Sequence, residues 1–315
     1  MAEGYIVRVL IVGGQENKIR HALMQELSNK QVCYIVADRK KENSILSSLV
    51  HHQVNTFLNK MELADLMEKY QIDCVIDLSN EPIMSNKMKD SFEHSEKNIA
   101  RTLEVLEACV EAKVGKIIFP STIAVYGDLE DVITEDMVLQ PVLFEGLSKK
   151  IVEKYIQHYH TLYGLSYTIL RFPILYGEYS FQKQNESIVE TTIKNVLENR
   201  PSICFKDGED KKHFLHISDA VKAFISSLNK GTNEIFNICP MEKYSMKEVV
   251  SIIQSLINED SLPRVGLKKG EKSRISTKKA QVHLGWHAQV SFIEGIRLAM
   301  VNIKHALKQK NELLK

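Results

Sequence analysis

The sequence lacks an excess of charge of either sign, because 41 Lys and Arg residues stand against 40 Asp and Glu residues, a formal net charge of +1. A protein that binds nucleic acid or another polyanion through its overall field needs a basic surplus. The composition therefore argues against that class. Basic residues do gather at 268–272 and at Lys278-Lys279, and such short clusters are typical of a solvated face or loop.

Paired cysteines and long apolar segments are also lacking. The number of cysteines is odd, and none stands in a C-x-x-C pair of the kind that binds zinc or performs redox chemistry. The first residues show no signal-peptide pattern, and no apolar run approaches the roughly 18 residues of a membrane span. We therefore expect a soluble cytoplasmic protein with reduced thiols, no metal and no membrane contact. The cysteines are Cys33, Cys74, Cys109, Cys204 and Cys239.

Short repeats and low-complexity linkers are absent as well, and a regular alternation of apolar runs with helical patterns is present instead. Strands that alternate with helices imply right-handed βαβ units and a parallel sheet. The near-continuous apolar run at 9–12 fits a sheet covered on both faces. The patterns predict strands at 5–12, 32–37, 54–58, 74–78, 116–120 and 167–171, and helices at 18–27, 61–70, 93–112 and 148–163.

The pattern loosens after Gly177, where a turn-rich stretch surrounds Asp207-Gly208. We therefore predict an α/β fold, a Rossmann-like doubly wound parallel sheet with a smaller C-terminal α/β part packed on the carboxyl edge of the sheet. Ligands of open α/β folds bind at this edge. Helical spacing in the smaller part recurs at 188–197, 219–228, 245–257 and 291–307.

Several sequence motifs carry the functional information. Gly13-Gly14 closes the first strand before a helix, and Asp38 lies 25 residues after Gly13, which by itself is a weak indication of dinucleotide binding. The segments Ser121–Gly127 (STIAVYG) and Gly146–Lys149 (GLSK) are more specific. Further motifs follow one another along the chain at Asn98–Thr102, Leu170–Gly177, Asp207–Asp219, Phe236–Ile238 and Leu284–Trp286.

Together these segments resemble the extended short-chain dehydrogenase/reductase family, especially its NAD-dependent epimerase/dehydratase members similar to UDP-glucose 4-epimerase. The resemblance covers nearly the whole chain in the correct order. It implies an NAD(P)-binding Rossmann-like domain at 1–176, with contributions from about 205–240, and a smaller substrate-binding part at 177–315. It also implies NAD as the cofactor and a nucleotide sugar, UDP-linked, as the substrate or ligand.

The phosphate loop departs from the family pattern, in which three glycines let the backbone approach the pyrophosphate of NAD at a helix N-terminus. Here Gly13 holds the first glycine position and is followed by Gly14, whereas Glu16 and Ile19 hold the second and third positions. A carboxylate is stabilised at a helix N-terminus, so we hypothesise that Glu16 occupies the anion site itself and weakens NAD binding. Ile19 would also push the helix away from the first strand.

Other cofactor positions follow from the same resemblance. Asp38 matches the acid that binds the adenosine ribose hydroxyls and favours NAD, although a turn residue after a strand is an equally good interpretation. Arg39 and Lys40 could instead receive the 2′-phosphate of NADP. The resemblance further implies that Asn98 and Lys149 contact the cofactor.

The reaction site is altered at its central residue. In the family a Tyr-x-x-x-Lys pair works with a Ser or Thr, and the Tyr removes a sugar hydroxyl proton as hydride leaves for the nicotinamide. The resemblance assigns Thr122, Glu145 and Lys149 to these catalytic positions, with Glu145 in place of the Tyr. Glu145 could act as a base, or it could form only an i,i+4 ion pair with Lys149. The dehydratase branch is disfavoured, because Ile123 and Ala124 replace its Asp-Glu pair.

The substrate side departs from the family as well. Thr122 also matches a substrate contact, Ile174 replaces an Asn that contacts the nucleotide sugar, and Lys212 replaces an Arg that pairs with the UDP diphosphate. A lysine keeps the charge but loses the bidentate fork of an arginine. His213 and His216 stand three residues apart, but a metal site needs more ligands at a recognisable spacing.

Two function classes remain open on the sequence. The first is an enzyme of the UDP-sugar 4-epimerase type, with NAD-linked keto-sugar chemistry that is weakened or atypical because Glu145 or water replaces the Tyr. The second is a catalytically inactive protein of the same fold that binds a nucleotide sugar or a partner subunit. The phosphate loop and the Tyr position have changed independently, which keeps the second class in view.

Helix faces give an expectation about assembly. Tyr155, Tyr159 and Tyr163 share one face of a predicted helix, which indicates either internal packing or a dimer face. In the family, the helix bearing Lys149 and the helix bearing Asn98 form a four-helix dimer interface. The resemblance therefore implies a homodimer.

Overall fold

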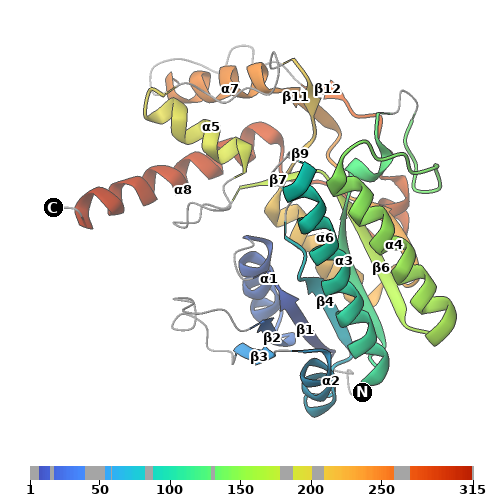
Figure 1. Cartoon of the computed structure of the whole chain (residues 1–315). Coiled ribbons are helices and arrows are strands. Elements are labelled where there is room, and N and C mark those ends of the chain that lie inside the picture. Colours follow the sequence, from blue (N-terminus) through green and yellow to red (C-terminus); the bar gives the residue numbers. More distant parts are fainter. Residues whose placement is uncertain are drawn as a thin grey trace, which may run out of the picture.

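The computed structural model describes residues 7–14, 18–39, 54–57, 59–81, 88–128, 132–177, 187–200, 209–258 and 270–313. Its centre is a seven-stranded parallel sheet in the order β10-β6-β5-β4-β1-β2-β3. The strand order reverses between β1 and β4 (Figure 1). The strands are β1 (Arg8–Gly13), β2 (Cys33–Arg39), β3 (Val54–Phe57), β4 (Cys74–Leu78), β5 (Lys116–Thr122), β6 (Ser166–Phe172) and β10 (Glu234–Asn237).

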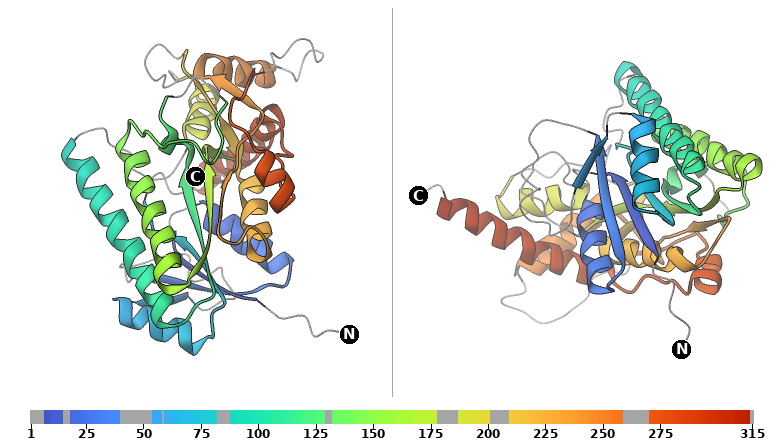
Figure 2. Two further views of the ribbon diagram at one scale, coloured as in Figure 1. Left: turned by 90° about the vertical axis from the view of Figure 1, so that its right-hand side faces the viewer. Right: turned by 90° about the horizontal axis from the view of Figure 1, so that it is seen from below.

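Helices cover both faces of this sheet, as Figures 1 and 2 show. Alternate residues of β1 explain the arrangement, since Val9 and Ile11 join the apolar cluster that contains α1 and α6, whereas Leu10 and Val12 join the cluster that contains α2, α3 and α4. The predicted Rossmann-like doubly wound sheet is therefore confirmed. The five helices are α1 (Lys18–Asn29), α2 (Lys60–Lys69), α3 (Met88–Glu111), α4 (Phe144–Tyr163) and α6 (Ile217–Asn229).

A smaller group of elements lies over the carboxyl ends of the strands (Figure 1). Apolar residues of α5, α7 and α8, among them Ile193, Val249 and Ile296, share a third buried cluster. The predicted boundary between 176 and 177 stays a prediction. The elements are α5 (Ile188–Leu197), α7 (Met246–Asn258), α8 (Phe292–Leu313), the parallel pair β7 (Ile174–Tyr176) and β9 (Phe214–His216), and the antiparallel strands β8 (Lys211–Lys212), β11 (Glu242–Ser245) and β12 (Glu271–Lys272).

The structure differs from the sequence expectation in several elements. β10 adds a seventh strand beside β6, although its four residues carry no long apolar run. α3 begins at Met88 rather than at 93, and α4 begins at Phe144 rather than at 148. Short strands such as β7 and β8 have only three and two residues, and they are stabilised by pairing across the chain rather than by a local pattern.

A buried polar network joins the central strands to α4. Arg171 donates from Nε to Oε1 of Glu153 at 3.0 Å and from Nη2 to Oε2 at 2.6 Å, and both side chains are 2% exposed. Ser121 donates to Glu153 at 2.5 Å, and Arg171 Nη1 donates to the hydroxyl of Tyr126 at 2.6 Å. Tyr126 in turn donates to Asn237 at 2.7 Å. The network therefore links β5, β6, β10 and α4 with the 3₁₀ helix at Ile123–Tyr126.

A second buried cation caps a helix end. Lys116, at the start of β5, is buried and donates to the carbonyls of Ser227 at 2.5 Å and Lys230 at 2.8 Å. Burial lowers the pKa of Lys116. These carbonyls lie at the C-terminal end of α6, where the helix dipole favours a positive charge.

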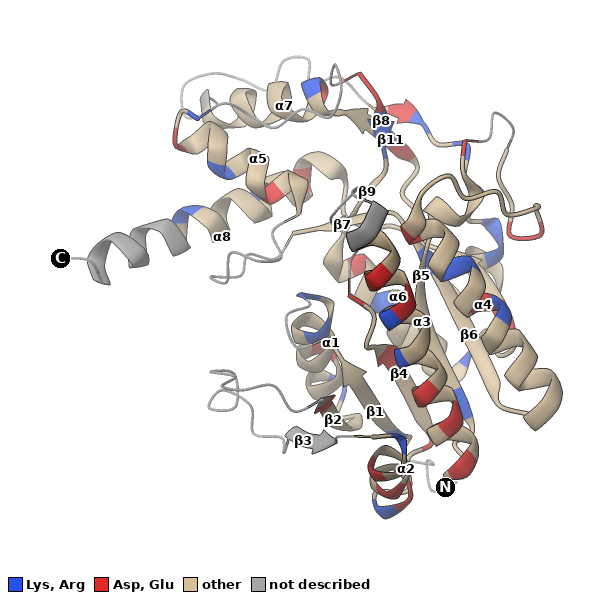
Figure 3. Cartoon of the chain, viewed as in Figure 1, with Lys and Arg blue, Asp and Glu red and all other residues tan. Residues whose placement is uncertain are grey.

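The surface carries charge of both signs, and most of the described thiols are buried. Acidic and basic residues are interspersed over the outer helices (Figure 3). Cys74, Cys109 and Cys239 are buried, Cys33 is exposed, and Cys204 lies outside the described residues. Among the helices in the described part of the chain, none has both the length and the hydrophobicity that a membrane crossing requires.

Candidate functional site

The candidate site lies where the strand order reverses, at the carboxyl ends of β1 and β4. Gly13 and Gly14 have φ values of +74° and +71°. A Cβ on Gly13 would stand 2.6 Å from Cα of Ser79, so glycine lets the end of β1 pack against the end of β4. Glu16, the residue assigned to the anion site, lies outside the described residues. Ile19 is buried in the apolar cluster that contains Val9 of β1.

Asp38 does not lie in a turn. It stands within β2, buried, and both of its carboxylate oxygens accept hydrogen bonds from Nη1 of Arg20 at 2.7 Å. Burial raises the pKa of Asp38, and the adjacent Arg20 guanidinium opposes that shift. The interpretation of Asp38 as a turn residue is therefore wrong. The sequence motifs also did not identify Arg20 as the partner of Asp38.

Lys149 points to the end of β4. Its ammonium donates to Oδ1 of Asn80 at 3.0 Å and to the carbonyl of Pro120 at 2.8 Å. The amide of Asn80 donates to the hydroxyl of Thr102 at 2.9 Å, and that hydroxyl donates to the buried carboxylate of Asp77 at 3.0 Å. A chain of hydrogen bonds thus fixes Lys149 at the carboxyl ends of β4 and β5.

Asn98 holds the backbone that follows β4. Its Oδ1 accepts from the amide of Glu81 at 2.9 Å, and its Nδ2 donates to the carbonyl of the same residue at 2.7 Å. Asn80 also donates to the carbonyl of Asn98 at 3.1 Å. Asn98 is buried, so in this structure its side chain shapes the β4–α3 connection that carries Asn80.

Burial shifts the pKa values of the titratable groups in the site toward their neutral forms. Burial lowers the pKa of Lys149 to about 8, against the opposing carboxylates of Asp77 and Glu145. Burial also raises the pKa of Asp77 and that of Glu145, and Lys149 opposes both shifts. A lysine and a carboxyl whose pKa values move toward each other are characteristic of sites that transfer protons.

Glu145 and Thr122 lie on either side of the junction between β5 and α4. Glu145 is in the first turn of α4. Lys149 directs its hydrogen bonds to Asn80 and Pro120, and the ion pairs among the described residues do not join it to Glu145. The expectation of a simple i,i+4 ion pair is therefore wrong. Thr122 accepts a hydrogen bond from the amide of Ala124 at 3.2 Å and so caps the 3₁₀ helix.

The two substrate-side candidates lie on the short strands between the two parts. Ile174 is paired in register with Phe214 in the β7–β9 sheet. Lys212, two residues earlier on β8, is exposed, with its ammonium 4.0 Å from Asp210. Ile174 and Lys212 therefore lie in two different small sheets, β7-β9 and β12-β11-β8, whereas Thr122, Glu145 and Lys149 gather at the end of the main sheet.

His213 and His216 are engaged with neighbouring hydroxyls. His213 lies 2.9 Å from the Ser273 hydroxyl, and burial lowers its pKa to about 4. Nδ1 of His216 accepts from the amide of Ser218 at 3.3 Å. Within the described ranges, no group of three or more His, Cys, Asp or Glu residues is arranged to hold a metal ion.

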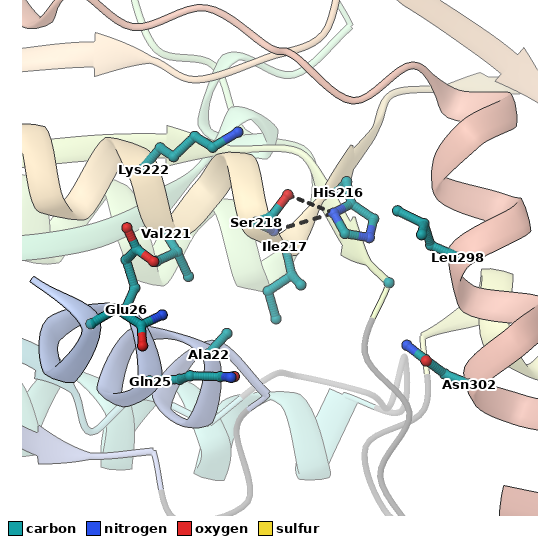
Figure 4. Close-up of a pocket in the computed structure, with 12 residues that line it drawn as sticks. Ala22, Gln25, Glu26, His216, Ile217, Ser218, Val221, Lys222, Leu298 and Asn302 are labelled. Carbon is teal, nitrogen blue, oxygen red and sulfur yellow. Dashed lines mark hydrogen bonds between the residues drawn. The ribbon is translucent and has the colours of Figure 1, made fainter. Parts of the chain in front are cut away.

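A surface groove of about 320 Å³ lies between α1, α6 and α8 (Figure 4). Figure 4 shows His216 and Ser218 at the start of α6, facing Leu298 and Asn302 of α8. The described lining residues include none of the three catalytic candidates. The groove is therefore separate from the site at the end of β5.

An ion pair joins α1 to the smaller part. The ammonium of Lys18 lies 2.8 Å from Oε2 of Glu190, and the Glu190 side chain is fully buried. The same carboxylate accepts from the amide of Gly177 at 2.9 Å and from that of Ser187 at 2.6 Å. The start of α1 is thereby tied to the start of α5.

A family model and two known relatives match most of this chain. The model of the NAD dependent epimerase/dehydratase family matches residues 10–239. A Methanocaldococcus jannaschii protein, provisionally named UDP-glucose 4-epimerase, is 30% identical over 249 residues, which are 78% of this chain and 81% of the relative. The human dTDP-D-glucose 4,6-dehydratase is 26% identical over 316 residues, 93% of this chain and 89% of the relative.

Solved structures share the fold over almost the whole chain. The Thermotoga maritima UDP-glucose 4-epimerase, solved with UDP-glucose, has a TM-score of 0.82 at 23% identity and covers 96% of this chain and 100% of its own. The Bacillus cereus UDP-glucuronic acid 4-epimerase, solved with UDP-glucuronic acid and NAD, has a TM-score of 0.78 at 24% identity, with coverage of 95% and 100%.

Proposed function

Since the chain belongs to the NAD-dependent epimerase/dehydratase family, we propose that it binds a UDP-linked sugar and a nicotinamide dinucleotide and interconverts sugar epimers through a keto intermediate. In this proposal Glu145 replaces the family's Tyr as the group that carries the proton. The observation that carries the proposal is the placement of Lys149, which is fixed at the carboxyl ends of β4 and β5 in the electrostatic field of Glu145.

The residues at the strand ends fit such a cofactor in part. Gly13 and Gly14 leave the β1–α1 turn without side chains, and Lys149 keeps a third N–H free of the two hydrogen bonds to Asn80 and Pro120. When bound, a nicotinamide dinucleotide supplies a hydride acceptor. In our proposal the backbone of both glycines and the ammonium of Lys149 would hold it, with Asn98 shaping the adjacent loop and Asp38 held by Arg20 at the end of β2.

Glu145 would take the hydroxyl proton of the sugar as the C–H hydride passes to the nicotinamide. It would return the proton to the oxygen as the hydride is restored to the opposite face of the turned keto sugar. A carboxyl suits both steps when its pKa lies nearer neutrality than usual, and burial raises the pKa of Glu145 in that direction. The positive charge of Lys149 keeps Glu145 able to ionise, because it lowers the energy of the carboxylate. Thr122 would hydrogen-bond the same hydroxyl, and Lys212 and Ile174 would face the nucleotide.

A second candidate function is binding of the nucleotide sugar without turnover. The pairing of Asp38 with Arg20 favours it, because the carboxylate that would bind the ribose hydroxyls already accepts two hydrogen bonds. The departures at Glu16 and Ile19 point the same way. The two candidates differ in whether product forms.

We also propose that the chain forms a homodimer through α3 and α4. Large apolar side chains are exposed on these two helices, including Phe92 (61%), Leu147 (43%) and Tyr155 (40%). α3 and α4 pack beside each other on the same sheet face. Pairing this face with the same face of a second copy would bury these side chains. Large exposed apolar patches commonly mark such interfaces.

Turnover of the purified protein tests the proposal. UDP-glucose, UDP-galactose and UDP-glucuronate are each incubated with the protein, with NAD or NADP added, and the sugars are resolved by NMR. We expect epimer formation, and we expect Glu145→Gln to lower kcat by about 10² to 10⁴. Glu68→Gln, on the exposed surface of α2, is the matched control. Unchanged kcat in Glu145→Gln would refute its role, and saturable UDP-sugar binding without product would establish the second candidate.

A further inference from the structure

Arg20 occupies an unusual position for a cation. It lies on the inward face of α1, in the same stripe as Ile19, Leu23 and Leu27, and only 7% of its surface is exposed. Its Cβ stands 3.5 Å from where a Cβ on Gly14 would be. The side chain therefore starts beside the glycine turn and crosses to the end of β2.

Within the described part of the chain, each side-chain hydrogen bond of Arg20 is donated by the same nitrogen, Nη1. Nη1 donates to both oxygens of Asp38 at 2.7 Å and to the carbonyl of Gly13 at 3.1 Å. These contacts hold the guanidinium between the end of β1 and the end of β2. In a dinucleotide-binding α/β fold, the acid at the end of the second strand binds the adenosine ribose, so Arg20 stands at that corner of the site.

The opposite edge of the guanidinium is free. Among the described residues, Nε and Nη2 of Arg20 have no hydrogen-bond partner, and neither atom is counted among the fully buried polar atoms that lack one. This edge is therefore not fully buried, although only 7% of the residue is exposed. Two parallel N–H groups on one edge form the fork that binds a phosphate in a bidentate manner.

Arg20 also changes the net charge at this corner of the site, because it lies beside the carboxylate of Asp38. An unpaired carboxylate at the end of β2 would repel a phosphate on the ribose, and the Arg20 guanidinium cancels that charge at 2.7 Å. The residues after Asp38 in the sequence are Arg39, Lys40 and Lys41. Arg39 is the last residue of β2, and Lys40 and Lys41 follow it in the sequence, ahead of Glu42.

From these contacts we propose that Arg20 sets the cofactor specificity, so that the adenosine end of the site prefers a 2′-phosphorylated adenosine, as in NADP(H), over the free ribose of NAD(H). Asp38 serves as the anchor of the guanidinium rather than as the ligand of the ribose hydroxyls. The assignment rests on the proposed function only in placing a dinucleotide at this edge of the sheet.

The test uses adenosine nucleotides alone, so that it does not depend on sugar turnover. Calorimetric titration of the full chain compares adenosine 2′,5′-bisphosphate with 5′-AMP, and NADPH with NADH. We expect the 2′-phosphorylated member of each pair to bind at least tenfold tighter. Arg20→Gln should abolish that preference, and Arg20→Lys, which keeps the charge without the fork, should retain part of it. Arg200→Gln, at an exposed arginine, is the control.

A double variant guards against loss of the fold, because Arg20→Gln alone leaves a buried carboxylate unpaired. Arg20→Gln with Asp38→Asn removes both charges, and it should likewise lose the preference for the 2′-phosphate. Equal or tighter binding of 5′-AMP by the natural protein, or binding of neither nucleotide, would overturn the assignment. If selective binding of the bisphosphate persists without epimerase turnover, the proposed function fails and the role of Arg20 stands. Epimerase turnover together with tighter binding of NADH would support the proposed function and refute the role of Arg20.

Discussion

Removal of Glu153 should destabilise the protein more than any surface change, because its carboxylate is the only acidic side chain paired with the buried Arg171 among the described residues. Glu153→Ala leaves that guanidinium without its bidentate partner and the hydroxyl of Ser121 without its acceptor. The remaining contacts from Arg171, to the Tyr126 hydroxyl and to the carbonyl of Glu135, do not neutralise the charge.

The magnitude follows from these contacts. Breaking one side of a buried ion pair costs about 3–5 kcal/mol, and loss of the Ser121 hydrogen bond adds about 1 kcal/mol. For 315 residues, an unfolding entropy of about 2.1 cal/mol/K per residue gives about 0.7 kcal/mol per degree at the midpoint. Glu153→Ala should therefore lower Tm by roughly 6–9 °C.

The assay is urea and thermal unfolding followed by circular dichroism, with a double-mutant cycle. Glu153→Met combined with Arg171→Met replaces the pair by apolar groups, and we expect it to recover at least half of the loss. Lys154→Ala, at an exposed neighbour on α4, should stay within about 0.5 kcal/mol of the natural protein. A loss below about 1 kcal/mol in Glu153→Ala would refute the reasoning.

Three further predictions follow from the same geometry. Lys116→Met should cost about 2–3 kcal/mol in urea unfolding, because the carbonyls at the end of α6 lose their donor; a change under 0.5 kcal/mol would contradict this. Because burial lowers the pKa of Lys149 to about 8, the unfolded state binds more protons between pH 8 and the ordinary lysine range. The stability of the natural protein should therefore rise relative to Lys149→Met as pH increases from 8 to 10, by about 2 kcal/mol, and a flat difference would exclude the shift. Leu147→Asp, at an exposed position of α4, should weaken self-association at least tenfold in analytical ultracentrifugation, and an unchanged dimer would exclude this face.

The main sheet could be predicted from the sequence because its strands are buried on both faces. Runs such as Val9–Val12 are apolar throughout, and the helices between them repeat apolar residues at helical spacing, so local pattern and global position agree. β10 escaped prediction because its four residues are stabilised by pairing with β6, in which Glu234 lies opposite Thr168. Nothing in the local pattern of β10 records that partner.

The site was predictable in its members but not in their contacts. Lys149 was expected to pair with Glu145 one turn away, but it bonds Asn80, 69 residues distant. The pairing of Asp38 with Arg20 has a clearer signal in the sequence, since Arg20 interrupts the apolar stripe of α1. A cation on a buried stripe requires a buried anion, and Asp38 in the next strand supplies it.

The seventh strand has a practical consequence for dividing the chain. A fragment that ends at residue 176 would contain six strands of the main sheet and would lack β10 and α6, which come from 217–237. The outer edge of β6, at Thr168–Arg171, would then present its unpaired backbone to solvent, and such an edge invites pairing with another copy. The fragment that ends at residue 176 should therefore aggregate when expressed alone. A chain that also includes 209–240 should remain dispersed in solution.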